Sequence, residues 1–167
     1  EIFLMLGRAY LGPGDETIST KHAFAIYAII GQQQGSTVIE VAEKNFTADV
    51  DAILKAVTPK TKAIYIESIA NPGGLVVDIP AISAIAKAAG VPLIVDNTLA
   101  TPYLIRPIDH GADIVVHSLT KFLGGHGNSL GGIIVDGGTF DWSKDNKYPM
   151  LSEPRPEYHG IRIQETF

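Results

Sequence analysis

The hydrophobic and polar positions of this sequence change period several times along the chain. Four short apolar runs have no polar alternation: 63–67 (AIYIE), 92–96 (PLIVD), 112–117 (ADIVVH) and 131–136 (GGIIVD). Runs of this length and kind are typical of strands buried on both faces of a sheet. We therefore predict four buried strands, and we add two more at 17–20 and at the alternating, Val- and Ile-rich segment 36–42.

Between these runs the apolar residues recur at helical spacing. The predicted helices are 1–11, 23–34, 48–57 and 79–89, with a short one at 105–110. Asp49 and Asp51 fall in the first turn of the third helix, and Gly90 follows the end of the fourth. Alternation of buried strands with helices predicts an α/β fold, with a mostly parallel sheet and helices on both faces.

The last residues of the chain have a different character. Pro149, Pro154 and Pro156 stand among charged and aromatic side chains. Proline removes a backbone donor and restricts the residue before it, so we predict an extended segment without a helix here. The predicted organisation is a main domain at 1–139 followed by a tail at 140–167.

Composition narrows the functional classes. Hydrophobic residues make up 46% of the 167 residues and mean hydropathy is +0.17, which is enough apolar material for a core. Net charge is −5 without a basic run, which argues against nucleic acid as a partner. The absence of cysteine excludes zinc-thiolate sites and fits a cytoplasmic protein, and no apolar stretch approaches membrane-spanning length.

Polar side chains follow the predicted strands where each strand ends. Glu67, Asp96 and Ser118 close three of the apolar runs, and Lys121 comes shortly after the last of them. The carboxyl ends of parallel strands share one edge of a sheet, where ligands bind. A lysine there is a candidate Schiff-base nucleophile, and a buried aspartate can keep a pyridine nitrogen protonated. Lys121 and Asp96 together therefore point to pyridoxal phosphate (PLP).

Each of these residues also has a purely structural interpretation. Lysines after strands are usually solvated, and an aspartate at a strand end often caps a helix. Ser118 and Thr120 are placed to bind a phosphate but are equally suited to a turn. His117 and His126 lack the paired spacing of metal ligands, so we expect packing or hydrogen-bonding roles and no metal site. Spacing alone leaves these alternatives open.

The segment 95–138 resembles the Cys/Met-metabolism family of PLP enzymes. It carries a VDNT strand end and the string HSLTKFLGGH without interruption. The resemblance implies the large domain of a fold-type I PLP enzyme, present in part. It also implies that Lys121 attaches the cofactor, that Asp96 pairs with its ring nitrogen, and that Ser118 and Thr120 contact its phosphate. Asn71, in IESIANPGG, matches the family asparagine that contacts the phenolic oxygen of the cofactor.

The segment 140–160 resembles an insertion of the O-acetylhomoserine sulfhydrylases. This implies γ-replacement on O-acetyl-L-homoserine by sulfide or methanethiol, giving homocysteine or methionine plus acetate, as part of methionine biosynthesis. The family further implies a homo-oligomer. Its phosphate loop, N-terminal arm and substrate-binding C-terminal domain find no match in this sequence, so we expect a fragment or a chimera.

The first third of the chain has a second resemblance. The segment 8–62, with GPGDE, HAFAIY and DVDAILKAVTPKTK, resembles histidinol-phosphate aminotransferase, also a fold-type I PLP enzyme. In that alignment Phe24 stacks on the cofactor ring, although a core aromatic is an equal alternative. Two other functions therefore stay open: a histidinol-phosphate aminotransferase, and an α/β fragment without catalysis.

Overall fold

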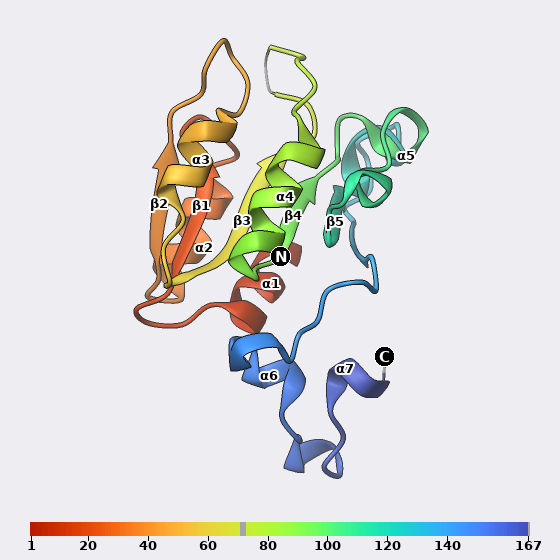
Figure 1. Ribbon diagram of the computed structural model, residues 1–167. Coiled ribbons are helices and arrows are strands. Elements are labelled where there is room, and N and C mark those ends of the chain that lie inside the picture. The colour runs from red at the N-terminus through yellow and green to blue at the C-terminus, as the bar shows by residue number, and fades with distance from the viewer. Residues whose placement is uncertain (71–72, 167) are drawn as a thin grey trace.

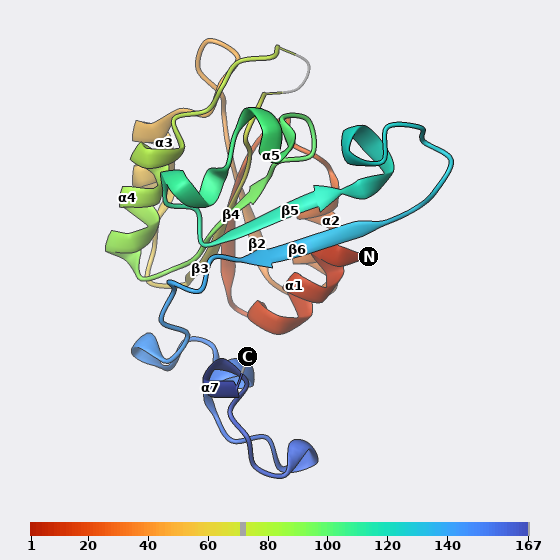
Figure 2. The same ribbon diagram turned by 90° about the vertical axis from the view of Figure 1, so that its right-hand side faces the viewer.

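The computed structural model describes residues 1–70 and 73–166, which form a six-stranded sheet with helices on both faces (Figures 1 and 2). The strand order is β2-β1-β3-β4-β5-β6, parallel from β2 to β5, with β6 antiparallel to β5. The strands are β1 Glu16–Thr20, β2 Thr37–Val41, β3 Thr61–Glu67, β4 Leu93–Asp96, β5 Ile114–Ser118 and β6 Gly132–Asp136. The predicted α/β class and mostly parallel sheet are confirmed.

Helices α1 and α2 cover one face of the sheet, and α3 and α4 cover the other (Figure 2). Their bounds are α1 Ile2–Tyr10, α2 Ile26–Gln33, α3 Val50–Ala56 and α4 Ile79–Ala89. Helix α4 has the predicted bounds because both ends carry local signals. The Asp78 side chain accepts a hydrogen bond from the Ala81 N–H, and Gly90 closes the helix in the left-handed conformation (φ 62°).

The core consists of two apolar clusters, one on each face of the sheet. On β3, Ile64 and Ile66 pack toward α3 and α4, whereas Ala63 and Tyr65 pack toward α1 and α2. Each large aliphatic side chain buried in this way contributes roughly 1.5–3 kcal/mol. Because both faces are covered, the strand needs apolar residues at every position, and this explains the missing alternation in its sequence.

The prediction of a fourth strand buried on both faces, at 131–136, is wrong. Strand β6 pairs only with β5, runs antiparallel to it and lies at the edge of the sheet. Gly132 and Ile133 are exposed, the latter at 42%. Its apolar run looks like that of a central strand, but the position of a strand in the sheet depends on pairing, which the sequence pattern does not encode.

Helix α2 begins three residues later than predicted, at Ile26. The preceding residues are held by tertiary contacts instead. The Phe24 N–H donates to the Glu67 carboxylate over 3.0 Å, across 43 positions of sequence. This hydrogen bond stabilises a bend in the chain after β1, and the bend places Phe24 at the carboxyl edge of the sheet.

The tail at 140–167 is not the uniformly extended segment predicted. It contains short helical turns at Lys144–Asn146, Pro149–Ser152 (α6), Pro156–Tyr158 and Ile163–Thr166 (α7). Pro149 and Pro156 begin two of these turns, because the first position of a helix needs no N–H donor and proline already has the required φ.

The first part of the tail is anchored at the amino-terminal edge of the sheet. Trp142 and Tyr148 are buried, and Trp142 stacks on Tyr10 with ring centroids 5.0 Å apart. The Tyr148 hydroxyl donates to the Lys62 carbonyl over 2.7 Å. Figure 1 shows the tail below the sheet, at the end opposite to the tips of the parallel strands.

Three short elements complete the fold. They are α5 Thr101–Leu104, a 3-10 helix at Pro107–His110 that corresponds to the short helix predicted at 105–110, and a π-helical turn at Leu119–Leu123. The first and third were not predicted, because one turn of helix has no recognisable period. Among the described residues, no helix has the length and apolar character needed to span a bilayer.

Candidate active site

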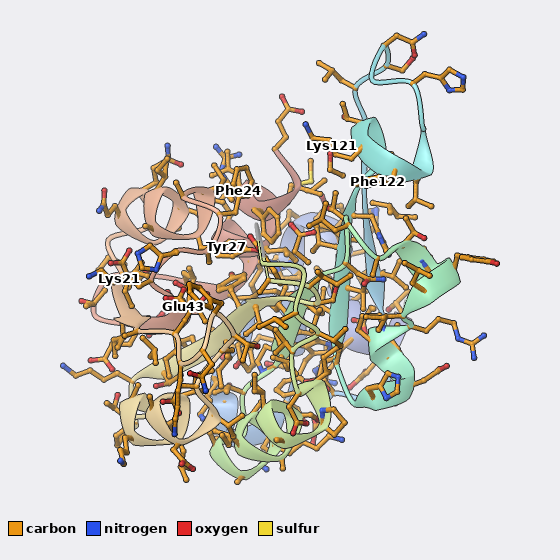
Figure 3. The ribbon with its side chains drawn as sticks, turned by 90° about the horizontal axis from the view of Figure 1, so that it is seen from above. Lys21, Phe24, Tyr27, Glu43, Lys121 and Phe122 are labelled. Carbon is orange, nitrogen blue, oxygen red and sulfur yellow. The ribbon has the colours of Figure 1, made fainter. Side chains whose placement is uncertain are left out.

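The carboxyl ends of the parallel strands bring the predicted polar residues to one edge. Glu67 and Asp96 are direct register partners on β3 and β4, and Ser118 ends β5 next to them. Figure 3 looks onto this edge, with Phe24 and Tyr27 on one side and Lys121 and Phe122 on the other. This is the position at which open α/β sheets bind ligands.

A cleft of about 610 Å³ lies between these two groups of side chains. It is lined by His22, Ala23, Phe24, Ala25, Glu67, Ile69, Asp96, Thr98, Leu99, Ser118, Lys121 and Phe122. Four predicted site residues are among them: Phe24, Asp96, Ser118 and Lys121. The fold thus brings together an amine, a carboxylate, a hydroxyl and an aromatic ring from three widely separated parts of the sequence.

Asp96 provides a partly buried negative charge in the lining of the cleft. Burial raises the pKa of its carboxyl group, although the hydrogen bond from Thr98 N–H (2.9 Å) works in the opposite direction. A carboxylate in this environment is stabilised by a cationic hydrogen-bond donor. A protonated pyridine nitrogen is such a donor, so Asp96 fits the role predicted for it.

His117 lies beside Asp96 on the next strand. It is 3% exposed, and its Nδ1 has no hydrogen-bond partner. Burial lowers the pKa of His117. A backbone hydrogen bond with Asn97 and the charge of Asp96 raise this pKa, but burial has the larger effect, so the ring is neutral at pH 7. A neutral His117 leaves the Asp96 charge without a cation from this side.

Lys121 stands in the π-helical turn directly after β5. The turn is kinked at this residue (φ −90°, ψ −124°), and the side chain is exposed and lines the cleft. Ser118, three residues earlier, donates its N–H to the Thr98 hydroxyl over 2.8 Å. The hydrogen bond from Ser118 to Thr98 therefore joins the segment that contains Lys121, after β5, to the segment that follows Asp96, after β4.

For two other predicted site residues the structure does not test the predicted role. Thr120 is not among its lining residues, and the Thr120 hydroxyl exchanges hydrogen bonds with the backbone of Gly131, at 3.2 Å from its nitrogen and 3.4 Å from its oxygen. Its phosphate contact stays a prediction. Asn71 lies outside the described residues, so its contact with the phenolic oxygen stays a prediction as well.

Phe24 forms the aromatic wall of the cleft. Its ring is 55% exposed and meets Tyr27 edge to face, with centroids 6.2 Å apart. Tyr27 is 3% exposed and stacks on Tyr65. Burial raises the pKa of Tyr27, and the charges of Asp96 and Glu67 raise it further, so the phenol stays neutral. A half-exposed ring on a buried aromatic base is suited to cover one face of a planar ligand.

Several residues at this edge were not assigned site roles from the sequence. This group consists of Tyr27, the paired side chains of His22 and Glu43, and Glu67, which contacts the Phe24 backbone. Of these residues, only Glu67 could have been recognised from the sequence, because it is a charged residue at the end of an apolar strand.

His126 is exposed, and within 1–70 and 73–166 there is no cluster of three side chains that could bind a metal ion.

Fold and site together define a cofactor-binding α/β domain with a lysine and an aspartate at adjacent strand ends. Residues 4–153 match the family model described as Cys/Met metabolism PLP-dependent enzyme. The chain belongs to this family. The match includes the whole of segment 8–62, whose resemblance pointed to histidinol-phosphate aminotransferase, and that second resemblance stays a prediction.

Relatives support the same assignment. The chain is 53% identical over 120 residues to an O-acetyl-L-homoserine sulfhydrylase of Leptospira meyeri, covering 72% of this chain and 27% of the relative. It is 43% identical over 165 residues to the sulfhydrylase-like protein lolC2 of Epichloe uncinata, covering 95% and 33%. The chain thus spans about a quarter to a third of the length of these curated relatives.

Solved structures agree on the fold. A putative O-acetylhomoserine (thiol)-lyase of Campylobacter jejuni, which carries a pyridoxyl-lysine phosphate, superposes with a TM-score of 0.83 at 29% identity, covering 98% of this chain and 40% of that chain. A cystathionine γ-lyase of Lactobacillus plantarum gives a TM-score of 0.70 at 35% identity, covering 81% and 35%. These neighbours confirm the predicted fold-type I architecture, present in part.

Proposed function

We propose that this chain is the cofactor-binding part of a PLP-dependent enzyme that carries out γ-replacement on O-acetyl-L-homoserine. The observation that carries the proposal is the common cleft of Lys121, Asp96 and Phe24. The products are homocysteine and acetate with sulfide, or methionine and acetate with methanethiol. The sulfhydrylases among the relatives support this choice of reaction over the aminotransferase.

Each residue has a defined task in this reaction. PLP, when bound, acts as an electron sink that makes the Cα and Cβ protons of the substrate acidic. Lys121 attaches the cofactor and, once released by the substrate amine, carries protons between these carbons as base and acid. Asp96 holds the ring nitrogen protonated, Phe24 covers one ring face, and Ser118 stands next to the lysine to bind the phosphate.

Covalent attachment tests the site directly. The protein is incubated with PLP, reduced with borohydride and digested, and the modified peptide is located by mass spectrometry. We expect modification at Lys121 and its loss in Lys121→Ala. Lys21→Ala is the matched control, because Lys21 is another exposed lysine on the same edge of the sheet (Figure 3). Equal labelling of both lysines, or labelling that survives Lys121→Ala, would refute the site.

Substrate tests separate the candidate reactions. Homocysteine from O-acetylhomoserine and sulfide supports γ-replacement, whereas glutamate from histidinol phosphate and 2-oxoglutarate supports the aminotransferase. A chain that attaches PLP but turns over neither pair is the non-catalytic fragment.

We also propose that the enzyme is a cytoplasmic homo-oligomer. Large apolar side chains on the surface support self-association, among them Tyr103 and Leu130, which are 93% and 94% exposed. Analytical ultracentrifugation over a range of concentrations tests this, and a monomer at all concentrations would contradict it for this chain.

A further inference from the structure

A second cavity of about 590 Å³ lies beside the cofactor cleft. It is built on the ends of β1, β2 and β3 and on the loops that follow them. Its lining residues are Thr20, His22, Ala23, Glu43, Phe46, Thr47, Ala48, Ile66, Glu67, Ala70, Gly73 and Val77. None of the roles proposed above uses this cavity.

The two spaces share part of their walls. His22, Ala23 and Glu67 line both of them. In Figure 3, Phe24 and Tyr27 lie between Glu43, on the side of the second cavity, and Lys121. A ligand in the second cavity would therefore border the cleft in which the proposed chemistry takes place.

The walls favour a neutral, apolar ligand. Ala48, Ile66 and Val77 form the inner surface, and the largely exposed Phe46 ring lies at the opening. Two carboxylates, Glu43 and Glu67, also line the cavity and disfavour an anion. Both already accept hydrogen bonds, so they do not require a cationic ligand.

His22 is the polar group of the cavity best defined by its contacts. Glu43 accepts a hydrogen bond from the His22 backbone N–H (2.8 Å) and lies 2.7 Å from the ring Nδ1. Burial raises the pKa of Glu43, but the hydrogen bonds from His22 outweigh this and the net shift is downward. An ionised carboxylate only accepts, so Nδ1 carries a proton toward Glu43, and Nε2 is the ring nitrogen that remains for a ligand.

We propose that this second cavity binds the alkyl group of a thiol, R–SH, whose S–H faces Nε2 of His22. The inference rests on the proposed function and names the class of its sulfur donor. Sulfide is about the size of one water molecule, whose share of liquid volume is ~30 Å³. The apolar cavity is far larger than that, whereas a short alkyl chain makes use of its walls.

The chemical step balances without any further reagent. Lys121 removes the Cβ proton, the C–H electron pair forms a double bond between the β and γ carbons, and acetate departs from the γ carbon with the C–O electron pair. The S–H bond then breaks and its proton passes to His22, while the sulfur electron pair forms the new C–S bond at the γ carbon. Lys121 returns its proton to Cβ, where the double-bond electron pair accepts it. The products are the S-alkyl homocysteine and acetate, and the proton on His22 returns to solvent.

Binding is tested by NMR on the 17.8 kDa chain without PLP. Butane-1-thiol is titrated under reducing conditions while the methyl signals of Ile66 and Val77 are followed, and sodium sulfide is the comparison ligand. We expect saturable shifts of these methyl groups with butane-1-thiol and none with sulfide. Shifts confined to Leu99 and Leu123, near the cofactor cleft, or no saturation at all, would overturn the inference.

Variants locate the ligand. Ala48→Leu fills the cavity, and Ala88→Leu adds the same atoms on an exposed position of α4 as the matched control. We expect butane-1-thiol to bind at least about fourfold more weakly to Ala48→Leu than to the wild type, which is the effect of losing the burial of one methylene group. The control variant should bind it with wild-type affinity. Phe46→Ala removes an exposed wall without touching the core, and it should weaken binding even if Ala48→Leu fails to fold. Normal binding to Phe46→Ala would overturn the inference.

The sulfur end is tested separately. Butane-1-thiol should bind more tightly than butyl methyl sulfide, which lacks the S–H donor, by about two- to threefold for a weak hydrogen bond. His22→Ala should abolish this preference, whereas Lys21→Ala should keep it. A preference that survives His22→Ala would overturn the assignment of His22.

The two proposals fail in different ways. If PLP does not attach to Lys121 while butane-1-thiol still binds at the Ile66 and Val77 methyl groups, the proposed function is wrong. If attachment succeeds and the thiol does not bind, the second cavity is not the site of the sulfur donor and only this inference is wrong.

Discussion

Asp96→Asn should stabilise the protein without its cofactor and weaken cofactor binding. In the folded chain the Asp96 carboxylate is partly buried, and the neighbouring His117 is neutral at pH 7, so His117 does not compensate the charge. Asparagine keeps an oxygen that accepts the Thr98 N–H hydrogen bond. The substitution therefore removes a desolvated charge while it retains the local contact.

The expected gain is about 1 kcal/mol in the free energy of unfolding at pH 8, a common value when a functional residue is relieved of strain. For a chain of this length that corresponds to roughly 2–4 °C in Tm. Burial raises the pKa of Asp96, so the folded state binds its proton more tightly than the unfolded state does. The stability of the wild type relative to the variant therefore falls as pH rises above the unfolded pKa of ~3.9 and through the folded pKa.

PLP should reverse this order. A ligand at one hundred times its Kd stabilises the folded state by ~2.7 kcal/mol, and the variant should gain much less because its amide cannot pair with a protonated ring nitrogen. Asp113→Asn is the matched control, since burial also raises the pKa of Asp113, which lies at the opposite edge of the sheet and accepts the Leu93 N–H. Thermal unfolding of the wild type and both variants is measured under four conditions, at pH 5 and pH 8, each with and without PLP. If Asp96→Asn is less stable than wild type without PLP, or if PLP stabilises both equally, the reasoning is refuted.

Tyr148→Phe should lower the free energy of unfolding by about 1 kcal/mol through loss of its hydrogen bond to a β3 carbonyl, and urea unfolding will measure it; an unchanged midpoint would mean that the tail is not anchored there. Gly7→Ala should destabilise by about 1–3 kcal/mol in the same assay, because a Cβ would lie 2.2 Å from Ile30 Cγ2 between α1 and α2. Alanine favours a helix by ~1 kcal/mol, so a net gain in stability would contradict this close packing. Glu67→Gln should accelerate amide exchange at Phe24 about fivefold, since loss of the charge weakens the hydrogen bond by ~1 kcal/mol; an exchange rate equal to wild type by NMR would show that this carboxylate does not hold the loop.

Local signals in the sequence were sufficient for several features. The bounds of α4 follow from a capping aspartate, helical spacing and Gly90, all within the segment itself. The apolar runs identified β3, β4 and β5, because a strand buried on both faces has few other compositions open to it. Lys121 and Asp96 were singled out because Asp96 ends one such run and Lys121 comes shortly after another. Both line the same cleft.

Other features depended on contacts between distant segments. The edge position and antiparallel direction of β6 follow from pairing with β5, and its apolar run resembles that of a central strand. The late start of α2 follows from a hydrogen bond between Phe24 and Glu67. The second cavity exists because loops after β1, β2 and β3 end side by side. Periodicity reports the average environment of a segment along its own axis, whereas strand order, long-range hydrogen bonds and cavities depend on which segments meet in space. The sequence by itself therefore determined the type of most elements and singled out Lys121 as the proposed attachment residue, and only the tertiary structure decided which side chains surround that lysine.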